Sequence, residues 1–245
     1  MRNEALTGYL LHQRSYQEKR ALYYLFSEQH GVIHGIGKKG APLFEPLQLF
    51  ATGKRDLKTF SQINIAPLDR DSLSSEPLRY EQIIGQQQYA ALYLNEILWK
   101  LLPTEDPMPV LWQHYQDSLL QLKQTLTALE LRLCLRQFEQ HLFEQLGFAI
   151  SLVQDSSLND IDADSTYRFL PDVGLVPIIP ADGIVNAQAQ AVISGSEIVA
   201  MAELGITEAT LNAWSRLYRH LIDHLLDYQP LQSRLLWQQQ QRYQS

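Results

Sequence analysis

The first 66 residues contain five short apolar stretches that only turn residues separate, and this spacing constrains the fold more than any other feature. Each stretch is rich in Leu, Ile, Tyr or Phe, as strands are. Because no helix-length segment lies between them, a small barrel fits better than a parallel sheet with crossover helices. The expected strands are residues 5–12, 21–27, 31–37, 47–52 and 57–65.

The basic residues of this region gather in the expected turns. Residues 1–80 hold 11 Lys and Arg against 8 Asp and Glu, whereas residues 81–245 hold 9 against 19. A chain that is acidic as a whole and basic at one end can bind nucleic acid through that end. A difference of this size can also arise by chance between two domains. The candidate phosphate-binding cations are Arg14, Lys19, Arg20, Lys38, Lys39, Lys54, Arg55 and Lys58.

Five short strands make the five-stranded oligonucleotide-binding (OB) barrel the natural candidate, and aromatic residues that interleave with the cations favour binding of single-stranded nucleic acid. In such a barrel, cations follow the phosphates of a single strand and rings stack on its bases. The competing interpretation is that tyrosines at alternating positions are ordinary residues of the barrel wall. The aromatic residues concerned are Tyr9, Tyr16, Tyr23, Tyr24 and Phe26.

The remainder of the chain is predicted to be mainly α-helical, so the fold class is α+β. Helices are expected over 80–102, 110–126 and 128–148, with Gly147 in a left-handed cap. We expect an OB domain over 1–78, a linker over 69–76 and a helical domain over 79–245. The helical domain would contain an irregular, hairpin-like insertion at about 150–182, short helices ending at Leu204 and near Tyr228, and a polar tail that frays.

The helix 128–148 has the most regular apolar stripe of the chain, and two arginines flank it. Arg132 and Arg136 lie four residues apart on one face. They either pair with Glu139 and Glu144 on a solvated surface or form an anion-binding edge beside an apolar pocket. The stripe consists of Leu131, Leu135, Phe138, Leu142 and Leu146.

Five segments, in the same order, resemble the RecO family of DNA repair and recombination mediators. They are YLLHQRSYQEKRALYYLFSEQHGVIHGIGKKG, GKRDLKTF, YLNEILWKLLPTEDP, LRQFEQHLFEQLGF and PLQSR. The resemblance implies binding of single- and double-stranded DNA, strand annealing, and partnership with RecR and single-strand binding protein. It also implies that the helical domain receives the acidic, Phe-ending tail of single-strand binding protein. The residues expected to bind that tail are Arg132, Arg136, Phe138, Arg216 and Arg219.

Two departures from the family pattern change what is expected. Gly40 runs directly into Ala41-Pro42, without the longer basic insertion of many relatives, so DNA contact there would be weaker or differently placed. Some relatives hold zinc with four cysteines after the central helix, whereas Cys134 is the only cysteine here. We therefore expect no metal and no other cofactor, and Cys134 is interpreted as a small core residue.

No catalytic constellation is evident, and we expect a protein that is not an enzyme. His220, Asp223 and His224 lie in the segment HLIDH, but the known metal-binding pattern requires Glu in the position of Asp223, and no third ligand is evident. No apolar run is long enough to span a membrane, and residues 1–20 lack a signal-peptide pattern. The expected location is cytoplasmic, with the nucleoid.

We interpret the chain as a DNA-binding mediator of recombinational repair that pairs strands and helps to replace single-strand binding protein with recombinase. The alternative is a protein-interaction adaptor whose barrel binds no DNA. A metal-dependent enzyme built on His220 and His224 is a distant third interpretation.

Overall fold

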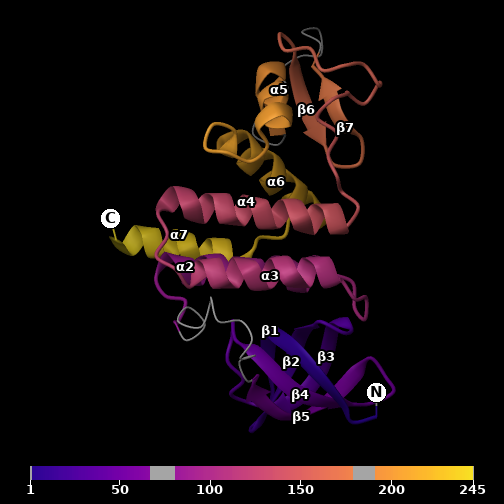
Figure 1. Ribbon diagram of the computed structural model, residues 1–245, viewed down its shortest axis with the longest axis vertical. Coiled ribbons are helices and arrows are strands. Elements are labelled where there is room, and N and C mark those ends of the chain that lie inside the picture. Colours follow the sequence, from indigo (N-terminus) through magenta and orange to yellow (C-terminus); the bar gives the residue numbers. More distant parts are fainter. Residues whose placement is uncertain (1, 67–80, 179–190, 245) are drawn as a thin grey trace, which may run out of the picture. The chain divides into compact units, whose positions relative to one another are not determined.

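The computed structural model describes residues 2–66, 81–178 and 191–244 of the 245-residue chain (Figure 1). The chain forms two compact units. The first contains Met1–Leu126 and Leu231–Ser245, and the second contains Thr127–Pro230. The linker expected over 69–76 and the domain boundary expected at 78/79 lie outside the described residues, so both stay predictions.

The N-terminal strands close into a barrel in the order β1-β2-β3-β5-β4, which confirms the expected OB topology. Only the pairing of β3 with β5 is parallel. β1 is longer than predicted because its first half pairs with β4 and its second half with β2, which closes the barrel. The strands are β1 (Glu4–Gln17), β2 (Arg20–Ser27), β3 (Gly31–Lys38), β4 (Pro46–Thr52) and β5 (Leu57–Ile65).

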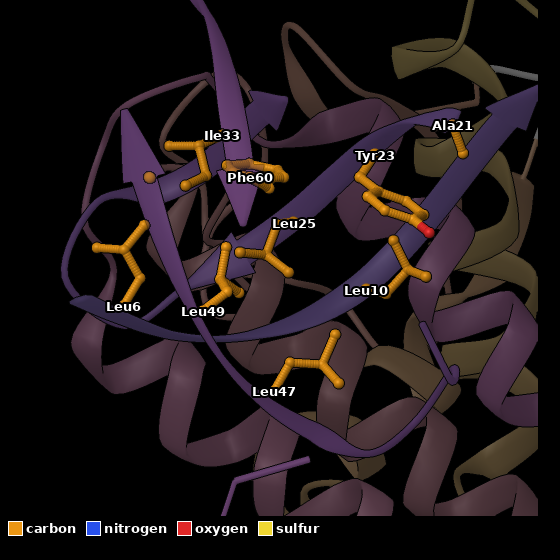
Figure 2. Close-up of a cluster of buried hydrophobic side chains, with 10 residues drawn as sticks. Leu6, Leu10, Ala21, Tyr23, Leu25, Ile33, Leu47, Leu49 and Phe60 are labelled. Atoms are coloured by element: carbon orange, nitrogen blue, oxygen red, sulfur yellow. The ribbon is translucent and has the colours of Figure 1, made fainter. Parts of the chain in front are cut away.

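The barrel interior is filled by alternate residues of its strands (Figure 2). The Tyr23 side chain is 1% exposed, and its hydroxyl donates a 2.6 Å hydrogen bond to the Lys38 carbonyl, which removes the cost of burying it. Gly35 has to lack a side chain, because a Cβ there would lie 2.5 Å from the Phe60 ring. The core residues are Leu6, Leu10, Ala21, Tyr23, Leu25, Ile33, Leu47, Leu49, Ala51 and Phe60.

The segment after helix α2 returns to the edge of β3 and fixes Gly31. The Glu105 amide donates to the Val32 carbonyl at 2.9 Å, and Val32 pairs with Thr104 in a parallel bridge. Gly31 has φ +65°, and a Cβ there would lie 1.9 Å from the Asp106 carbonyl oxygen. Any side chain at position 31 would therefore push this segment away from the barrel.

Helices α2 (Gln86–Leu101), α3 (Pro109–Leu122) and α7 (Gln232–Gln244) belong to the same unit as the barrel. α2 begins six residues later than predicted. The tail expected to fray is instead the helix α7, and that expectation was wrong. Contacts with α2 hold α7. The Tyr89 ring packs on Trp237 at 5.5 Å, and the Glu96 carboxylate accepts hydrogen bonds from the Gln232 and Ser233 amides at 2.9 and 2.8 Å. A carboxylate from another helix thus satisfies two amides at the start of α7 that would otherwise lack partners.

The second unit contains helices α4 (Ala128–Gln145), α5 (Gly195–Leu204) and α6 (Leu211–Leu225) with a sheet of order β7-β6-β8. The hairpin of β6 (Thr166–Leu170) and β7 (Gly174–Pro177) was expected, whereas β8 (Ala191–Ser194) was not. α4 and α5 both begin with capping boxes, Thr127 with Glu130 and Ser194 with Glu197. Within the described ranges, no helix combines the length and apolar character needed to cross a membrane.

Candidate nucleic-acid interface

Four of the predicted cations meet at one end of the barrel, where β1 turns into β2 and β3 ends. Arg20 lies directly opposite Lys38 in the β2–β3 ladder. The Lys39 amide donates to the Lys19 carbonyl at 3.1 Å, which joins the two turns. All four side chains are exposed. This group, the first basic rim, therefore presents four cationic side chains to solvent within two neighbouring turns.

Lys54 and Arg55 form a second basic rim in the turn between β4 and β5, where both side chains are exposed. Lys58 is not part of that turn, because β5 begins at Leu57. The Lys58 side chain is buried, and its ammonium group lies 2.5 Å from a Glu105 carboxylate oxygen and donates to the Arg55 carbonyl at 2.7 Å. The positive charge of Lys58 is thus paired with Glu105, and its side chain is not open to a phosphate. The side chains of the other seven predicted cations are exposed.

The aromatic residues singled out from the sequence divide into two groups. Tyr9, Tyr23 and Phe26 are 6%, 1% and 0% exposed, as residues of the barrel wall and its packing against the helices. Tyr16 is 55% exposed and Tyr24 is partly exposed. Of the five, only Tyr16 and Tyr24 present surface that a ligand can contact.

Tyr24 belongs to a row of rings across the outer surface of β1, β2 and β3. In the strand register it lies opposite His12 on β1 and His34 on β3, with ring centroids 5.5 and 4.5 Å away. Trp99 of α2 extends the row. Its indole stacks on His12 at 4.2 Å with 17° between the planes, and Tyr24 meets it edge-on at 5.4 Å. We call His12, Tyr24, His34 and Trp99 the ring row.

Sequence reasoning missed three members of the ring row. His12 and His34 lie directly opposite Tyr24, so all three side chains point to the same face of the sheet. Because side chains alternate along a strand, this shared face could have been recognised once the strands were paired. Trp99 could not be found in that way, because it comes from a helix more than 60 residues further along the chain.

Asn95 positions Trp99. The Asn95 amide nitrogen donates to the Leu10 and Leu11 carbonyls at 3.1 and 3.3 Å, where β1 changes register, and its oxygen accepts from the Tyr115 hydroxyl at 2.5 Å. Residues four apart share one face of a helix. Fixing Asn95 on β1 at Leu10 and Leu11 therefore places Trp99 one turn later, against His12.

The two histidines of the ring row have lowered pKa values. Burial is the largest cause for His12, followed by repulsion from Arg14, while Glu96 opposes the shift. Burial also lowers the pKa of His34, against the attraction of Asp56 and Glu105. Both imidazoles are consequently neutral around pH 7. Two cations lie over the row. The Arg14 guanidinium carbon is 5.9 Å from the Tyr24 ring and 5.6 Å from the Trp99 ring, and the Lys100 ammonium is 5.7 Å from the Trp99 ring.

The residues predicted to bind a partner's tail all lie in the second unit, but in different environments. Arg132, Arg216 and Arg219 are exposed. Arg132 donates to the Asn212 side-chain oxygen at 2.7 Å, which links α4 to α6, and Arg216 pairs with Glu197 of α5 at 2.7 Å. These contacts leave all three arginines accessible to an anion.

Arg136 and Phe138 lie deeper. The Arg136 side chain is 13% exposed and pairs with the buried carboxylate of Glu139, one of the two partners that the solvated-surface interpretation named. Phe138 is 1% exposed. A cavity of about 290 Å³ is present in this unit, but the segments after α4 and around β6–β7 line it, and none of the five predicted residues contributes.

His220 and His224 were the remaining candidates for chemistry. His224 lies 3.3 Å from an Asp172 carboxylate oxygen, and His220 meets the Phe169 ring edge-on at 6.3 Å. In the part of the chain that the structure describes, no three His, Cys, Asp or Glu side chains gather closely enough to hold a metal ion.

The closed five-stranded barrel and the helices that follow it define an OB-fold protein with a helical C-terminal region. Comparison with known proteins makes the class specific. Residues 85–235 match the family model described as "Recombination protein O C terminal". The chain therefore belongs to the RecO family.

Curated relatives extend this similarity over nearly the whole chain. The chain is 33% identical over 238 residues to the DNA repair protein RecO of Stutzerimonas stutzeri strain A1501, which covers 94% of this chain and 92% of the relative. It is 34% identical over 239 residues to the protein of that name from Pseudomonas putida strain W619, which covers 94% and 95%. The match to that of Pseudomonas aeruginosa strain UCBPP-PA14 is 33% over 241 residues, covering 95% and 94%.

Proposed function

We propose that this protein is a non-catalytic mediator of recombinational DNA repair that binds single- and double-stranded DNA through its barrel. It would pair complementary strands and, with RecR and single-strand binding protein, help to load recombinase on DNA of the cytoplasmic nucleoid. Membership of a family of DNA repair proteins supports the role in repair. The observation that carries DNA binding is the pair of exposed basic rims in the turns of the barrel.

The rims suit phosphate rather than a defined base sequence. Lysines and arginines that neutralise phosphates release condensed counterions, so affinity falls steeply with salt and depends little on sequence. The net charge of the chain is -7, so approach of DNA would be favourable only at a locally basic surface. The first and second basic rims are such surfaces, and Arg14 on β1 is a further exposed cation.

Salt titration of binding tests this proposal. Fluorescence anisotropy of a labelled single strand should give a steep, linear fall of log affinity with log salt concentration. Lys38→Ala with Lys39→Ala, or Lys54→Ala with Arg55→Ala, should lower the magnitude of that slope by about 0.7 for each phosphate that is no longer neutralised. Arg242→Ala is a matched control, because this exposed arginine on α7 is outside the rims.

The same titration distinguishes a DNA-binding mediator from a protein-interaction adaptor whose barrel binds no DNA. If the quadruple variant bound DNA as tightly as the wild type at every salt concentration, the rims would not be the DNA site. If the wild type bound no DNA while still capturing its protein partners, the adaptor interpretation would replace the mediator.

The tail of single-strand binding protein would bind the second unit through exposed arginines. Arg132, Arg216 and Arg219 are the accessible members of the predicted set. An exposed charged pair contributes about 0.2–1 kcal/mol, and reversing the charge replaces attraction by repulsion. Arg132→Glu and Arg219→Glu should therefore each weaken binding of a labelled acidic peptide that ends in Asp-Phe. DNA affinity of the isolated protein should persist, because the rims are untouched.

Arg136→Glu is less suitable as a test. It would bring a second carboxylate beside Glu139, which is 0% exposed, and unfolding would then be confused with loss of binding. Arg136→Met removes that repulsion, but the buried Glu139 would still lose its ion pair with Arg136. Unchanged peptide affinity in both Arg132→Glu and Arg219→Glu would show that these arginines belong to a solvated surface.

A further inference from the structure

We propose that the ring row, His12, Tyr24, His34 and Trp99, is a stacking platform for unpaired nucleobases, and that it makes the barrel distinguish single-stranded from double-stranded DNA. This inference rests on the proposed DNA binding and adds to it. The basic rims contact phosphates, which both forms of DNA possess. The ring row contacts base faces, which a paired and stacked duplex does not offer.

The strand register places the platform between the cations. On β2, Tyr24, Leu22 and Arg20 point to the same side, because alternate residues of a strand do. Four residues of strand span about 13 Å, so the row lies that far from Arg20 and the first basic rim. At its other end, His34 pairs with Leu57, which directly follows the turn of the second basic rim. A single strand running from the first rim towards the second would therefore pass the His34 end of the row, with Tyr24 and His12 beside it on β2 and β1.

The environment of the rings suits an uncharged aromatic ligand. Both imidazoles are held neutral around pH 7 by burial, so the row offers flat, uncharged surfaces rather than further cations. Arg14 lies within 6 Å of both the Tyr24 and the Trp99 rings, where its guanidinium can pair with a phosphate or stack beside a base. Lys100 lies over the Trp99 ring at 5.7 Å, but it also pairs with Glu96. The row thus combines stacking surface with two neighbouring cations, of which Arg14 is exposed.

Packing alone does not account for the exposure of these rings. Tyr9 and Trp112 also lie between the barrel and the helices, and they are 6% and 4% exposed. All four members of the ring row, in contrast, keep part of their surface open to solvent. Partly exposed aromatic side chains that are held rigid by neighbouring strands and a fixed helix are suited to contact a ligand, because little conformational entropy is lost on binding.

The test compares single-stranded and duplex DNA in paired variants. Tyr24→Leu and Trp99→Leu remove a ring but keep an apolar side chain, whereas Tyr24→Phe and Trp99→Phe keep a ring. Loss of a stacking ring weakens binding by about five- to one-hundred-fold for each base. The Leu variants should lose this factor for a thymine oligonucleotide of about 20 nucleotides, longer than the 4–16 that one such barrel covers. Duplex affinity should not change.

The salt slope separates this effect from weaker phosphate binding. Because no cation is removed, the Leu variants should bind more weakly at every salt concentration with the wild-type slope. Tyr243→Ala is the control, since this tyrosine on α7 is 89% exposed and outside the row. Circular dichroism and urea unfolding establish that each variant is folded.

Fluorescence tests the platform even if the Leu variants unfold. Trp99 is one of four tryptophans, and stacking of a base on it should quench emission. Trp99→Phe should bind single strands with little loss of affinity but lose the DNA-dependent quenching.

The outcomes also separate this inference from the proposed function. If the wild type binds DNA with a steep salt slope, and the Leu variants bind single strands equally well, the platform is wrong and DNA binding stands. Equal losses for single strands and duplex, or quenching that persists in Trp99→Phe, also overturn the platform. If the wild type bound no DNA, both the stacking platform and the proposed DNA binding would be wrong.

Discussion

Replacement of Glu96 by Gln tests how helix α7 is held in place. The Glu96 carboxylate is 8% exposed and accepts from the Gln232 amide, the Ser233 amide and the Ser233 hydroxyl at 2.9, 2.8 and 2.7 Å. Lys100 pairs with it at 3.0 Å. Hydrogen bonds to a charged acceptor contribute about 1.5–3 kcal/mol and neutral ones about 0.5–1.5, so Glu96→Gln should cost about 2–4 kcal/mol.

The loss of stability in Glu96→Gln should appear first as local unfolding of α7, at free energies below that of global unfolding. Helix α7 is polar, and Glu96 supplies the acceptor for its first amides, so weakening that acceptor should release the helix. Hydrogen exchange of the amides over 232–244 should accelerate in Glu96→Gln, and the midpoint of urea unfolding should decrease. Glu203→Gln is a matched control, because that glutamate of α5 is exposed and its substitution should change stability by less than about 0.5 kcal/mol.

The contribution of Glu96 should also depend on pH. Burial raises its pKa, but the hydrogen bonds from Ser233, Gln232 and Lys100 outweigh burial, so the pKa in the folded protein lies below the ordinary 4.5. The folded state then binds fewer protons than the unfolded state. The stabilisation is therefore fully present above pH 4.5 and is lost as the pH falls through the lower, folded value.

Wild type and Glu96→Gln should accordingly converge in stability on acidification. Two results would refute the reasoning. One is identical exchange of the 232–244 amides in the wild type and the variant at neutral pH. The other is a stability difference that does not shrink at acidic pH, because a difference of that kind would arise from packing rather than from the charge.

Three further predictions concern other buried groups. Asn95→Leu should destabilise the first unit by roughly 2–4 kcal/mol in urea unfolding, because it removes the acceptor of the Tyr115 hydroxyl and two hydrogen bonds to β1; additivity with Tyr115→Phe would contradict this coupling. Gly31→Ala should cost about 3 kcal/mol or more, since a positive φ and the Asp106 carbonyl both exclude a Cβ; an unchanged Tm would contradict it. Burial raises the pKa of Cys134 to about 11, so the native thiol should react slowly with iodoacetamide at about pH 8 and rapidly once unfolded, whereas fast native labelling would show that it is accessible.

Local patterns were sufficient to predict the barrel. Its five apolar stretches are separated by turn residues alone, and β4 and β5 end where the sequence pattern ends. The Gly147 cap was also predictable, because a left-handed residue after an apolar stripe is most often Gly, and here φ is 81°. Such features depend on neighbours in sequence and on side-chain period alone.

Features that depend on distant residues were missed. The tail has the composition of a fraying end, and contacts with α2, about 140 residues earlier, hold residues 232–244 as a helix. These contacts include Glu96 with the first amides and Tyr89 with Trp237. From the sequence, Lys58 was interpreted as an exposed lysine of the turn, whereas in the structure it pairs with Glu105. In both cases a charged side chain binds a group that is distant in sequence and comes close only in the folded chain. No sequence spacing identifies either pair in advance.

The ring row depends on a combination of local and distant causes. The register shift of β1 between Leu10 and His12 exposes two carbonyls that Asn95 binds, and that contact fixes the rotation of α2. Only then does Trp99 lie on His12 instead of elsewhere around the helix. A change in the register of β1 would therefore move the indole as well as the strand. For this reason, the placement of Trp99 should be sensitive to substitutions at Asn95 that touch neither the ring row nor the basic rims.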